Sequence, residues 1–250
     1  MTQRVAVVSG GGTGIGRAIA RRLASDGMHV IITGRRGDVV DRTAAELRRE
    51  TDRQVSGFQA DVGNPDDVAT LVAHVTEHYE RVDALVCNAG GSSGLPSGTL
   101  HEVASEWRRT FDQNVLTAVL LVQGFLPTLA RPGGRIILIG SNSTKSGGGI
   151  PSYAASKAAL SGWVLNLAAT HGRDGITANI VSPGYTPDTE LFGDGLPREL
   201  HDRIVSRTAI GRAGTSVDVA GAVGYLVSPE ASFVTGQVLE VTGGSLPPTA

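Results

Sequence analysis

The predicted fold depends on a stretch at the start of the chain, Val5-Ala6-Val7-Val8-Ser9-Gly10-Gly11-Gly12-Thr13-Gly14-Ile15-Gly16. Its first part is a short apolar run that predicts a strand, and its second part is a glycine-rich turn that opens a helix. Glycine here lets the backbone approach a pyrophosphate, whose charge then lies against the free N–H groups of the helix. The stretch therefore predicts a nucleotide-binding turn rather than a plain loop, with candidate contacts at Gly10, Gly12, Thr13, Gly14, Ile15 and Gly16.

Short apolar runs alternate with longer amphipathic segments along the whole chain, which is the pattern of βαβ units. Strands are predicted over Val5 to Ser9, His29 to Thr33, Gln54 to Ala60, Ala84 to Cys87, Arg135 to Ile139, Thr177 to Val181 and Val238 to Val241. Helices are predicted over Ile15 to Ser25, Val39 to Glu50, Pro65 to Tyr79, Glu102 to Leu129 (two helices that meet near Asp112), Tyr153 to His171 and Val217 to Leu226. Cap residues followed by acids predict helix starts at Asn64 and Thr215. We expect an α/β fold, a single Rossmann-type doubly wound domain over residues 1–250 with a seven-stranded, mainly parallel sheet flanked by helices.

Composition excludes several classes of function. The formal charge of −2 provides no basic field for nucleic acid or an anionic membrane. The single cysteine excludes an internal disulfide, and no Cys/His cluster has the spacing of a metal site. The N-terminal residues do not resemble a signal peptide, and no apolar run is long enough to span a bilayer. A cytoplasmic protein without a membrane or nucleic-acid partner is expected.

The end of the second predicted strand bears on the choice of cofactor. An acidic residue at this point would bind the ribose 2′-hydroxyl of NAD. The chain has Gly34-Arg35-Arg36 instead, and two guanidinium groups favour the 2′-phosphate of NADP. The alternatives are that Arg35 and Arg36 are only solvated surface charges, or that Asp38 turns back to the ribose and selects NAD.

One phenol and one amine are spaced by four residues in the segment Ser152-Tyr153-Ala154-Ala155-Ser156-Lys157. If this segment is helical, Tyr153 and Lys157 lie on the same face, one turn apart. An ammonium beside the phenol favours the phenolate, so the pair can act as an acid/base device at neutral pH. The same spacing also occurs on ordinary surface helices. The preceding apolar strand ends at Ser141, and the carboxyl end of such a strand is where open α/β sheets bind ligands.

Several short motifs follow one another in an order that resembles the short-chain dehydrogenase/reductase family along the entire chain, most closely the 3-oxoacyl-carrier-protein reductases. After the cofactor turn come Asp61-Val62, Asn88-Ala89-Gly90, Asn114 within Gln113-Asn114-Val115, Ser141, Tyr153 with Lys157, and Pro183-Gly184. The resemblance implies that Asp61 and Val62 contact the adenine and that Asn88, Ala89 and Gly90 support the cofactor side of the sheet. It further implies that the segment from Pro183 and Gly184 to Thr189 borders the nicotinamide. Caps and turns are the alternative account of these residues.

The resemblance also implies a mechanism, hydride transfer between a nicotinamide and a carbonyl carbon. Tyr153 would exchange the proton on the substrate oxygen, and Ser141 would polarise that oxygen. Lys157 would lower the Tyr153 pKa and hold the nicotinamide ribose. Asn114 resembles a residue that anchors a proton-carrying water, although it can instead simply interrupt a helix.

Three departures from the family pattern limit the prediction. Ser9 replaces the usual Thr but keeps the hydroxyl, and Cys87 replaces a second Asn. Ser141 precedes Tyr153 by one position fewer than expected, and the glycine-containing loop between them can absorb the deletion. Ser143 is therefore the alternative to Ser141.

The substrate is left open by the sequence. A segment over about residues 185–207 is expected to be a lid, in which Leu191, Phe192 and Leu196 offer apolar contact. A carrier-bound acyl thioester, a ketone, a sugar and a steroid alcohol all fit, and the family resemblance implies a homotetramer. The sequence leaves three functions open: an NADP(H)-dependent carbonyl reductase, an NAD-dependent alcohol dehydrogenase, and a nucleotide-binding regulator without turnover.

Overall fold

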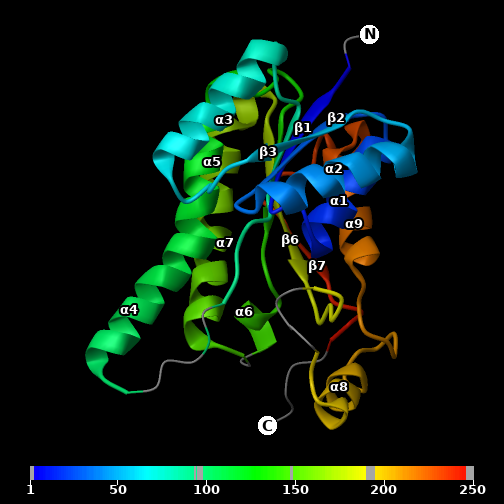
Figure 1. Ribbon diagram of the computed structural model, residues 1–250. Coiled ribbons are helices and arrows are strands. Elements are labelled where there is room, and N and C mark those ends of the chain that lie inside the picture. Colours follow the sequence, from blue (N-terminus) through cyan, green and yellow to red (C-terminus); the bar gives the residue numbers. More distant parts are fainter. Residues whose placement is uncertain (1–2, 93, 95–97, 147–148, 190–194, 246–250) are drawn as a thin grey trace.

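Seven parallel strands form one sheet in the order β3-β2-β1-β4-β5-β6-β7 (Figure 1). The computed structural model describes residues 3–92, 94, 98–146, 149–189 and 195–245. Within them the strands are β1 (Val5–Ser9), β2 (His29–Gly34), β3 (Val55–Gln59), β4 (Ala84–Cys87), β5 (Arg135–Ile139), β6 (Thr177–Pro183) and β7 (Val238–Val241). Every neighbouring pair is parallel. The predicted doubly wound fold is confirmed, with a sheet that is parallel throughout the described strands.

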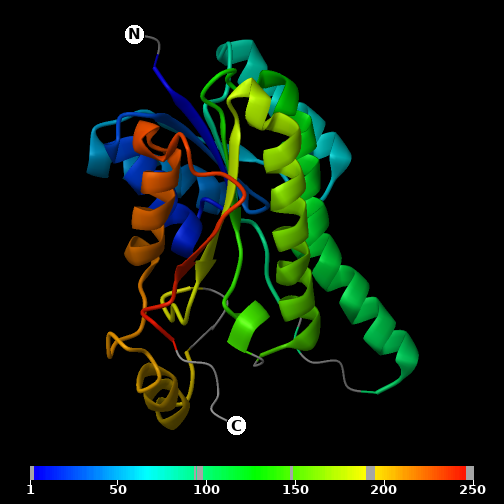
Figure 2. The same cartoon turned by 180° about the vertical axis from the view of Figure 1, so that it is seen from behind.

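Helices cover both faces of this sheet (Figures 1 and 2). One face carries α1 (Gly14–Ser25), α2 (Gly37–Thr51) and α9 (Ser216–Val227), and the other carries α3 (Pro65–His78), α5 (Thr117–Phe125) and α7 (Pro151–His171). Successive side chains of β1 alternate between the two cores, since Val7 belongs to one cluster and Ala6 and Val8 to the other. Strands buried on both faces need continuous apolar runs, which is the pattern that the sequence shows.

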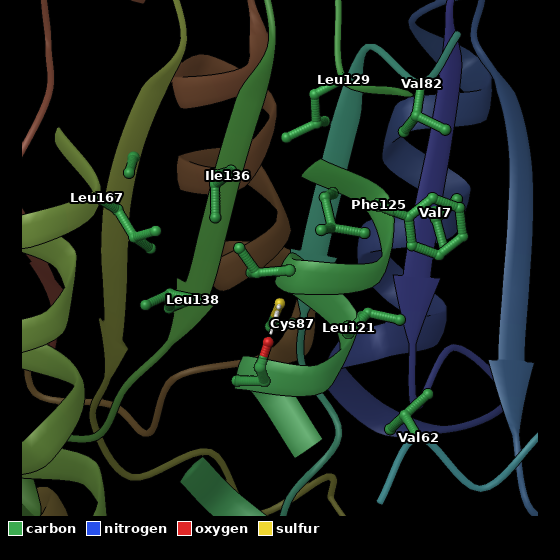
Figure 3. Packing of buried hydrophobic residues seen from close by; sticks show 14 of the residues in the cluster. Val7, Val62, Val82, Cys87, Leu121, Phe125, Leu129, Ile136, Leu138 and Leu167 are labelled. Atoms are coloured by element: carbon green, nitrogen blue, oxygen red, sulfur yellow. Dashed lines mark hydrogen bonds between the residues drawn. The ribbon is translucent and has the colours of Figure 1, made fainter. Parts of the chain in front are cut away.

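The core beneath α5 is shown from close by in Figure 3. Leu121 and Phe125 of α5 are fully buried there, in one cluster with Val7, Leu138 and Cys87. Burial raises the pKa of the Cys87 thiol to about 12. A thiol that stays protonated is a poor nucleophile, so Cys87 acts as a core residue.

The predicted break near Asp112 takes the form of a π-helical turn. The chain runs from α4 (Leu100–Phe111) through a π segment (Asp112–Leu116) directly into α5. Asn114 donates through Nδ2 to the carbonyl oxygen of Thr110 at 2.9 Å, four residues back. Such single-turn widenings often occur at functional sites.

The remaining elements shape the edge of the sheet at which the strands end. Two short helices, α6 (Ser143–Ser146) and α8 (Arg198–Val205), follow β5 and β6. Both predicted helix starts with a cap residue are confirmed. Asn64 caps α3 through the N–H of Asp66, and Thr215 forms a capping box with Asp218 at the start of α9.

Candidate active site

A cleft of about 1350 Å³ follows the carboxyl ends of the strands. This is the edge at which doubly wound sheets bind their ligands. It brings together every residue that was predicted to contact a cofactor: Gly10, Gly12, Thr13, Gly14, Ile15, Gly16, Arg35, Arg36, Asp61, Val62, Asn88, Ala89, Gly90, Tyr153, Lys157, Pro183, Gly184 and Thr189. Ser141 and Ser143 also line it. The assignment of individual roles stays a prediction.

The glycine turn has a backbone that other residues would not adopt. Gly10 and Gly14 have φ angles of 62° and 50°, in the left-handed region. A Cβ on Gly16 would overlap the carbonyl oxygen of Gly10, and one on Gly12 would come 3.2 Å from Val39. The turn leads into the N-terminus of α1 and leaves space against the backbone, as a pyrophosphate requires. These residues fit a dinucleotide.

The two central strands are tied together beside this turn. Ser9 Oγ accepts hydrogen bonds from the N–H groups of Asn88 and Ala89, both at 3.0 Å. The Asn88 amide donates to the carbonyl oxygens of Ser9 and Gly10 at 3.0 and 3.1 Å. Asn88 thus supports the cofactor turn from the end of β4. The Ser9 hydroxyl, which is kept where the family usually has Thr, links β1 to the residues that follow β4.

The far end of the cleft carries the arginine pair. Arg35 and Arg36 are exposed residues on its wall, just before α2 begins at Gly37. Asp38 lies in the first turn of α2 and is not among the described residues that line the cleft. Asp61 accepts a hydrogen bond from the N–H of Gly63 at 2.9 Å, so it forms a turn, which is the alternative to adenine contact. It also lines the cleft.

The acid/base residues come from two neighbouring elements. Tyr153 and Lys157 lie on α7, and the Lys157 Nζ is 5.8 Å from the centroid of the Tyr153 ring. Ser141 follows β5 and forms a hydrogen bond with Tyr153. Ser141 Oγ also accepts from the N–H of Ser143 at 3.2 Å. The contact with Tyr153 favours Ser141 over Ser143 as the residue beside the phenol.

The electrostatics of this group differ from the expectation that Lys157 lowers the Tyr153 pKa. Burial raises the pKa of Tyr153, and the hydrogen bond with Ser141 acts in the opposite direction. Burial also lowers the pKa of Lys157 to about 8. Desolvation disfavours the charged form of each group, and it is the largest cause of both pKa shifts.

Asn114 lies behind the cleft rather than on its wall. It is 1% exposed, and it exchanges hydrogen bonds with Gly91 through Oδ1 and Nδ2 at 3.1 and 2.8 Å. A Cβ added to Gly90 would come 2.5 Å from Asn114 Oδ1 and 3.2 Å from Lys157 Nζ. The two side chains therefore approach the same backbone position, which is compatible with the predicted link between Asn114 and Lys157.

The segment after β6 forms the other wall. Pro183 ends β6, and Gly184 packs so closely that an added Cβ would come 2.9 Å from Thr242. Leu191 and Phe192, expected in the lid, lie outside the described residues, and Leu196 is half-buried. The sequence did not single out three residues that also line the cleft, Ser92, Ile150 and Ser245. Thr186 and Ile204, which line it as well, fall within the expected lid. Tyr185, which also lines it, accepts or donates a 3.0 Å hydrogen bond with His201 of α8.

The described residues contain no group of three or more His, Cys, Asp or Glu side chains able to hold a metal ion. No helix among them is both long and apolar enough to cross a membrane.

Comparisons with known proteins agree with this geometry. The profile of the family described as enoyl-(acyl carrier protein) reductase matches residues 10–245. The chain is 37% identical to human "Dehydrogenase/reductase SDR family member 2, mitochondrial", over 98% of this chain and 87% of that protein. It is also 37% identical to "Granaticin polyketide synthase putative ketoacyl reductase 1" of Streptomyces violaceoruber, over 96% of this chain and 92% of that protein.

Solved structures also resemble this chain over nearly its whole length. A variant of actinorhodin polyketide ketoreductase with NADPH has a TM-score of 0.86 and 33% identity, with 97% of each chain covered. A blue fluorescent protein from a metagenomic library, in complex with NADPH, has a TM-score of 0.86 and 36% identity, with 96% of this chain and 97% of that chain covered. The chain belongs to the short-chain dehydrogenase/reductase family, a family of oxidoreductases.

Proposed function

We propose that this protein is an NADP(H)-dependent reductase of a ketone or a 3-oxoacyl group. The observation that carries the proposal is the meeting of Tyr153, Ser141 and Lys157 on one wall of a cleft whose opposite end carries Arg35 and Arg36. Two similar structures contain NADPH, which supports the choice of cofactor. One of them is a polyketide ketoreductase and one relative is a putative ketoacyl reductase, which supports reduction as the direction of the reaction.

The cofactor, when bound, supplies the hydride and carries the difficult chemistry. Ser141 donates a hydrogen bond to the substrate carbonyl oxygen and holds it next to the phenol. Tyr153 delivers the proton to that oxygen. Lys157, held by its 2.8 Å hydrogen bond to the Ile139 carbonyl, keeps a positive charge beside Tyr153 and stabilises the phenolate that remains.

Arg35 and Arg36 are proposed to select NADP(H) over NAD(H). Their guanidinium groups can make charge-assisted hydrogen bonds to a 2′-phosphate at the N-terminus of α2, where a phosphate is also favoured by the free N–H groups. Asp38 is exposed and is not among the described residues that line the cleft, which weakens the NAD-dependent alternative. The intact Tyr153, Lys157, Ser141 and Asn114 weaken the proposal of a regulator without turnover.

The chain is proposed to act as one domain over residues 1–250, with about 185–207 as a lid over the substrate. A carrier-bound thioester and a free ketone are both retained as substrates. The cytoplasmic location stays a prediction from the sequence.

A homotetramer is proposed from the family and from apolar side chains left on the surface. Phe233 is fully exposed at 101% and Leu165 of α7 is 59% exposed. Light scattering of the purified protein and of a Phe233→Asp variant tests this assembly.

The test is a titration of NADPH against NADH, followed by a carbonyl panel that includes ketones and 3-oxoacyl thioesters. We expect tighter binding of NADPH, oxidation of NADPH with at least one carbonyl, and loss of turnover with retained binding in Tyr153→Phe. Replacing both Arg35 and Arg36 by Ala should weaken NADPH binding by a few kcal/mol, at roughly 1.5 to 3 for each charge-assisted contact. Tighter NADH binding would support the NAD-dependent dehydrogenase, and binding without any turnover would support the regulator.

A further inference from the structure

A buried carboxylate lies between α4 and the helix that carries Tyr153. Glu106 is 8% exposed, and its hydroxyl partners Thr110 and Ser152 are 0% and 1% exposed. Glutamate is among the residues least often buried, because removing its charge from water is costly. The mechanism proposed above gives this side chain no task.

Glu106 holds the first turn of α7 through a single oxygen. Its Oε1 accepts hydrogen bonds from Ser152 Oγ and from Thr110 Oγ1, both at 2.7 Å. Ser152 lies in the first turn of α7, directly before Tyr153. Hydrogen bonds to a carboxylate are short and strong, and a negative charge at a helix N-terminus is favoured by the helix dipole. The start of the catalytic helix is thus fixed to α4.

The same contacts lead to Asn114. Thr110, which donates to Glu106, also accepts at its carbonyl oxygen from Asn114 Nδ2 at 2.9 Å. Asn114 then accepts from the N–H of Gly91 at the cleft. Glu106 is therefore connected to two residues of the proposed proton-transfer site. It reaches Tyr153 through the buried Ser152, and it reaches Asn114 through the buried Thr110.

The environment of the other carboxylate oxygen shows that a stabilising effect on the fold does not explain why a glutamate is present at position 106. Glu106 Oε2 is buried and has no hydrogen-bond partner among the described residues. A buried polar atom without a partner destabilises the folded state. An apolar side chain would fill this space without that cost, so the retained carboxylate calls for another explanation.

We infer that Glu106 is a positioning residue that, through Ser152 and Thr110, holds the Tyr153 hydroxyl in line with the substrate oxygen. This inference rests on the proposed function. Proton transfer requires the donor within hydrogen-bond reach, and small displacements of a reacting group lower the rate strongly. Glu106 acts through its neighbours, so it should affect the chemical step and leave cofactor binding unchanged.

The experiment compares Glu106→Ala, Glu106→Gln, Ser152→Ala and the Glu106→Ala/Ser152→Ala double variant in NADPH-dependent carbonyl reduction. We expect Glu106→Ala to lower kcat about 10- to 100-fold with the KM for NADPH within about 2-fold of the unmodified protein. Glu106→Gln keeps an oxygen for both hydroxyls and should recover most of kcat. The double variant should be no slower than Glu106→Ala, because both changes remove the same contact.

The matched control is Glu102→Ala, which removes another glutamate of α4. Glu102 is exposed and caps the start of the helix through Thr99, away from Ser152. An equal fall of kcat in Glu102→Ala, an unchanged kcat in Glu106→Ala, or additive losses in the double variant would overturn the inference. If Glu106→Ala does not fold, Ser152→Ala decides, and an unchanged kcat there overturns it. Absence of turnover in the unmodified protein would instead count against the proposed function.

Discussion

The Lys157 ammonium donates a 2.8 Å hydrogen bond to the carbonyl oxygen of Ile139, the last residue of β5. Lys157 lies on α7 beside Tyr153, and Ile139 lies two residues before Ser141. The bond therefore fixes the helix that carries the proposed acid to the strand that delivers its hydrogen-bond partner. The Lys157 side chain is only 5% exposed, and burying its positive charge lowers the stability of the fold.

Replacing Lys157 by Met should stabilise the fold at pH 7 while abolishing turnover. Lowering the lysine pKa from 10.5 to about 8 corresponds to a cost of about 3 kcal/mol at pH 7. The loss of a partner for the Ile139 carbonyl offsets about 1 to 2 kcal/mol of the gain. The net increase in the free energy of unfolding is expected to be about 1 to 2 kcal/mol in chemical denaturation.

The pH dependence of this difference provides the check. Between about pH 8 and pH 10.5 the unfolded chain binds more protons at Lys157 than the folded chain, so the unmodified protein gains stability from this residue as pH rises. The advantage of Lys157→Met should shrink across that range. Lys145→Met, which changes an exposed lysine, should alter stability by less than about 1 kcal/mol. An advantage that stays constant with pH would contradict the explanation.

Gly90 is predicted to tolerate no side chain. Its added Cβ would crowd Asn114 Oδ1 and Lys157 Nζ at 2.5 and 3.2 Å. Gly90→Ala should lower kcat about 10- to 100-fold, because both groups must shift. Gly91→Ala is the control, since a Cβ there meets nothing within 4 Å. Steady-state kinetics of the two variants compare the effects, and similar kcat values would show that the crowding has no catalytic consequence.

Ser9 should be replaceable by Thr but not by Ala. Ser9→Ala leaves the N–H groups of Asn88 and Ala89, two half-buried residues, without their acceptor, which should cost about 1 to 3 kcal/mol of stability and weaken NADPH binding. Ser9→Thr keeps the hydroxyl and should remain close to the unmodified protein. Ser25→Ala removes an exposed hydroxyl at the end of α1 and should change stability by about 0.5 kcal/mol or less. Thermal unfolding and cofactor titration measure both quantities.

The sequence predicted the sheet better than it predicted the helices near the site. The bounds of β1, β4, β5 and β7 are as predicted, because apolar content and turn residues change together at the ends of these strands. β6 extends further, to Pro183, since a proline at a strand end can still accept through its carbonyl, here from the N–H of Asn142 at 3.0 Å.

Two features of the candidate site had no readable signal. The π turn inserts a residue between α4 and α5 without changing composition, so periodicity shows only a boundary near Asp112. Glu106 stands among charged residues and resembles a solvent-facing position, and its burial follows from how α4 packs against α7. The cofactor turn and the Tyr153–Lys157 pair were found because their chemistry requires particular residues at fixed spacing.

The contact between Tyr185 and His201 should control the substrate end of the cleft. Tyr185 lines the cleft, and its hydroxyl forms a 3.0 Å hydrogen bond with His201 Nδ1, whose ring packs edge-on at 5.5 Å. His201 belongs to α8, which also brings Ile204 to the cleft wall. Tyr185→Phe keeps the ring contact and removes the hydrogen bond, so α8 should be held less firmly over the substrate. We expect the KM for the carbonyl substrate to rise about 2- to 10-fold, the equivalent of a hydrogen bond worth roughly 0.5 to 1.5 kcal/mol, with the KM for NADPH unchanged. His201→Phe should raise the KM for the carbonyl substrate by the same factor, and the double variant should raise it no further. A parallel rise in the KM for NADPH would instead mean that the pair supports the whole cleft and not only its substrate end.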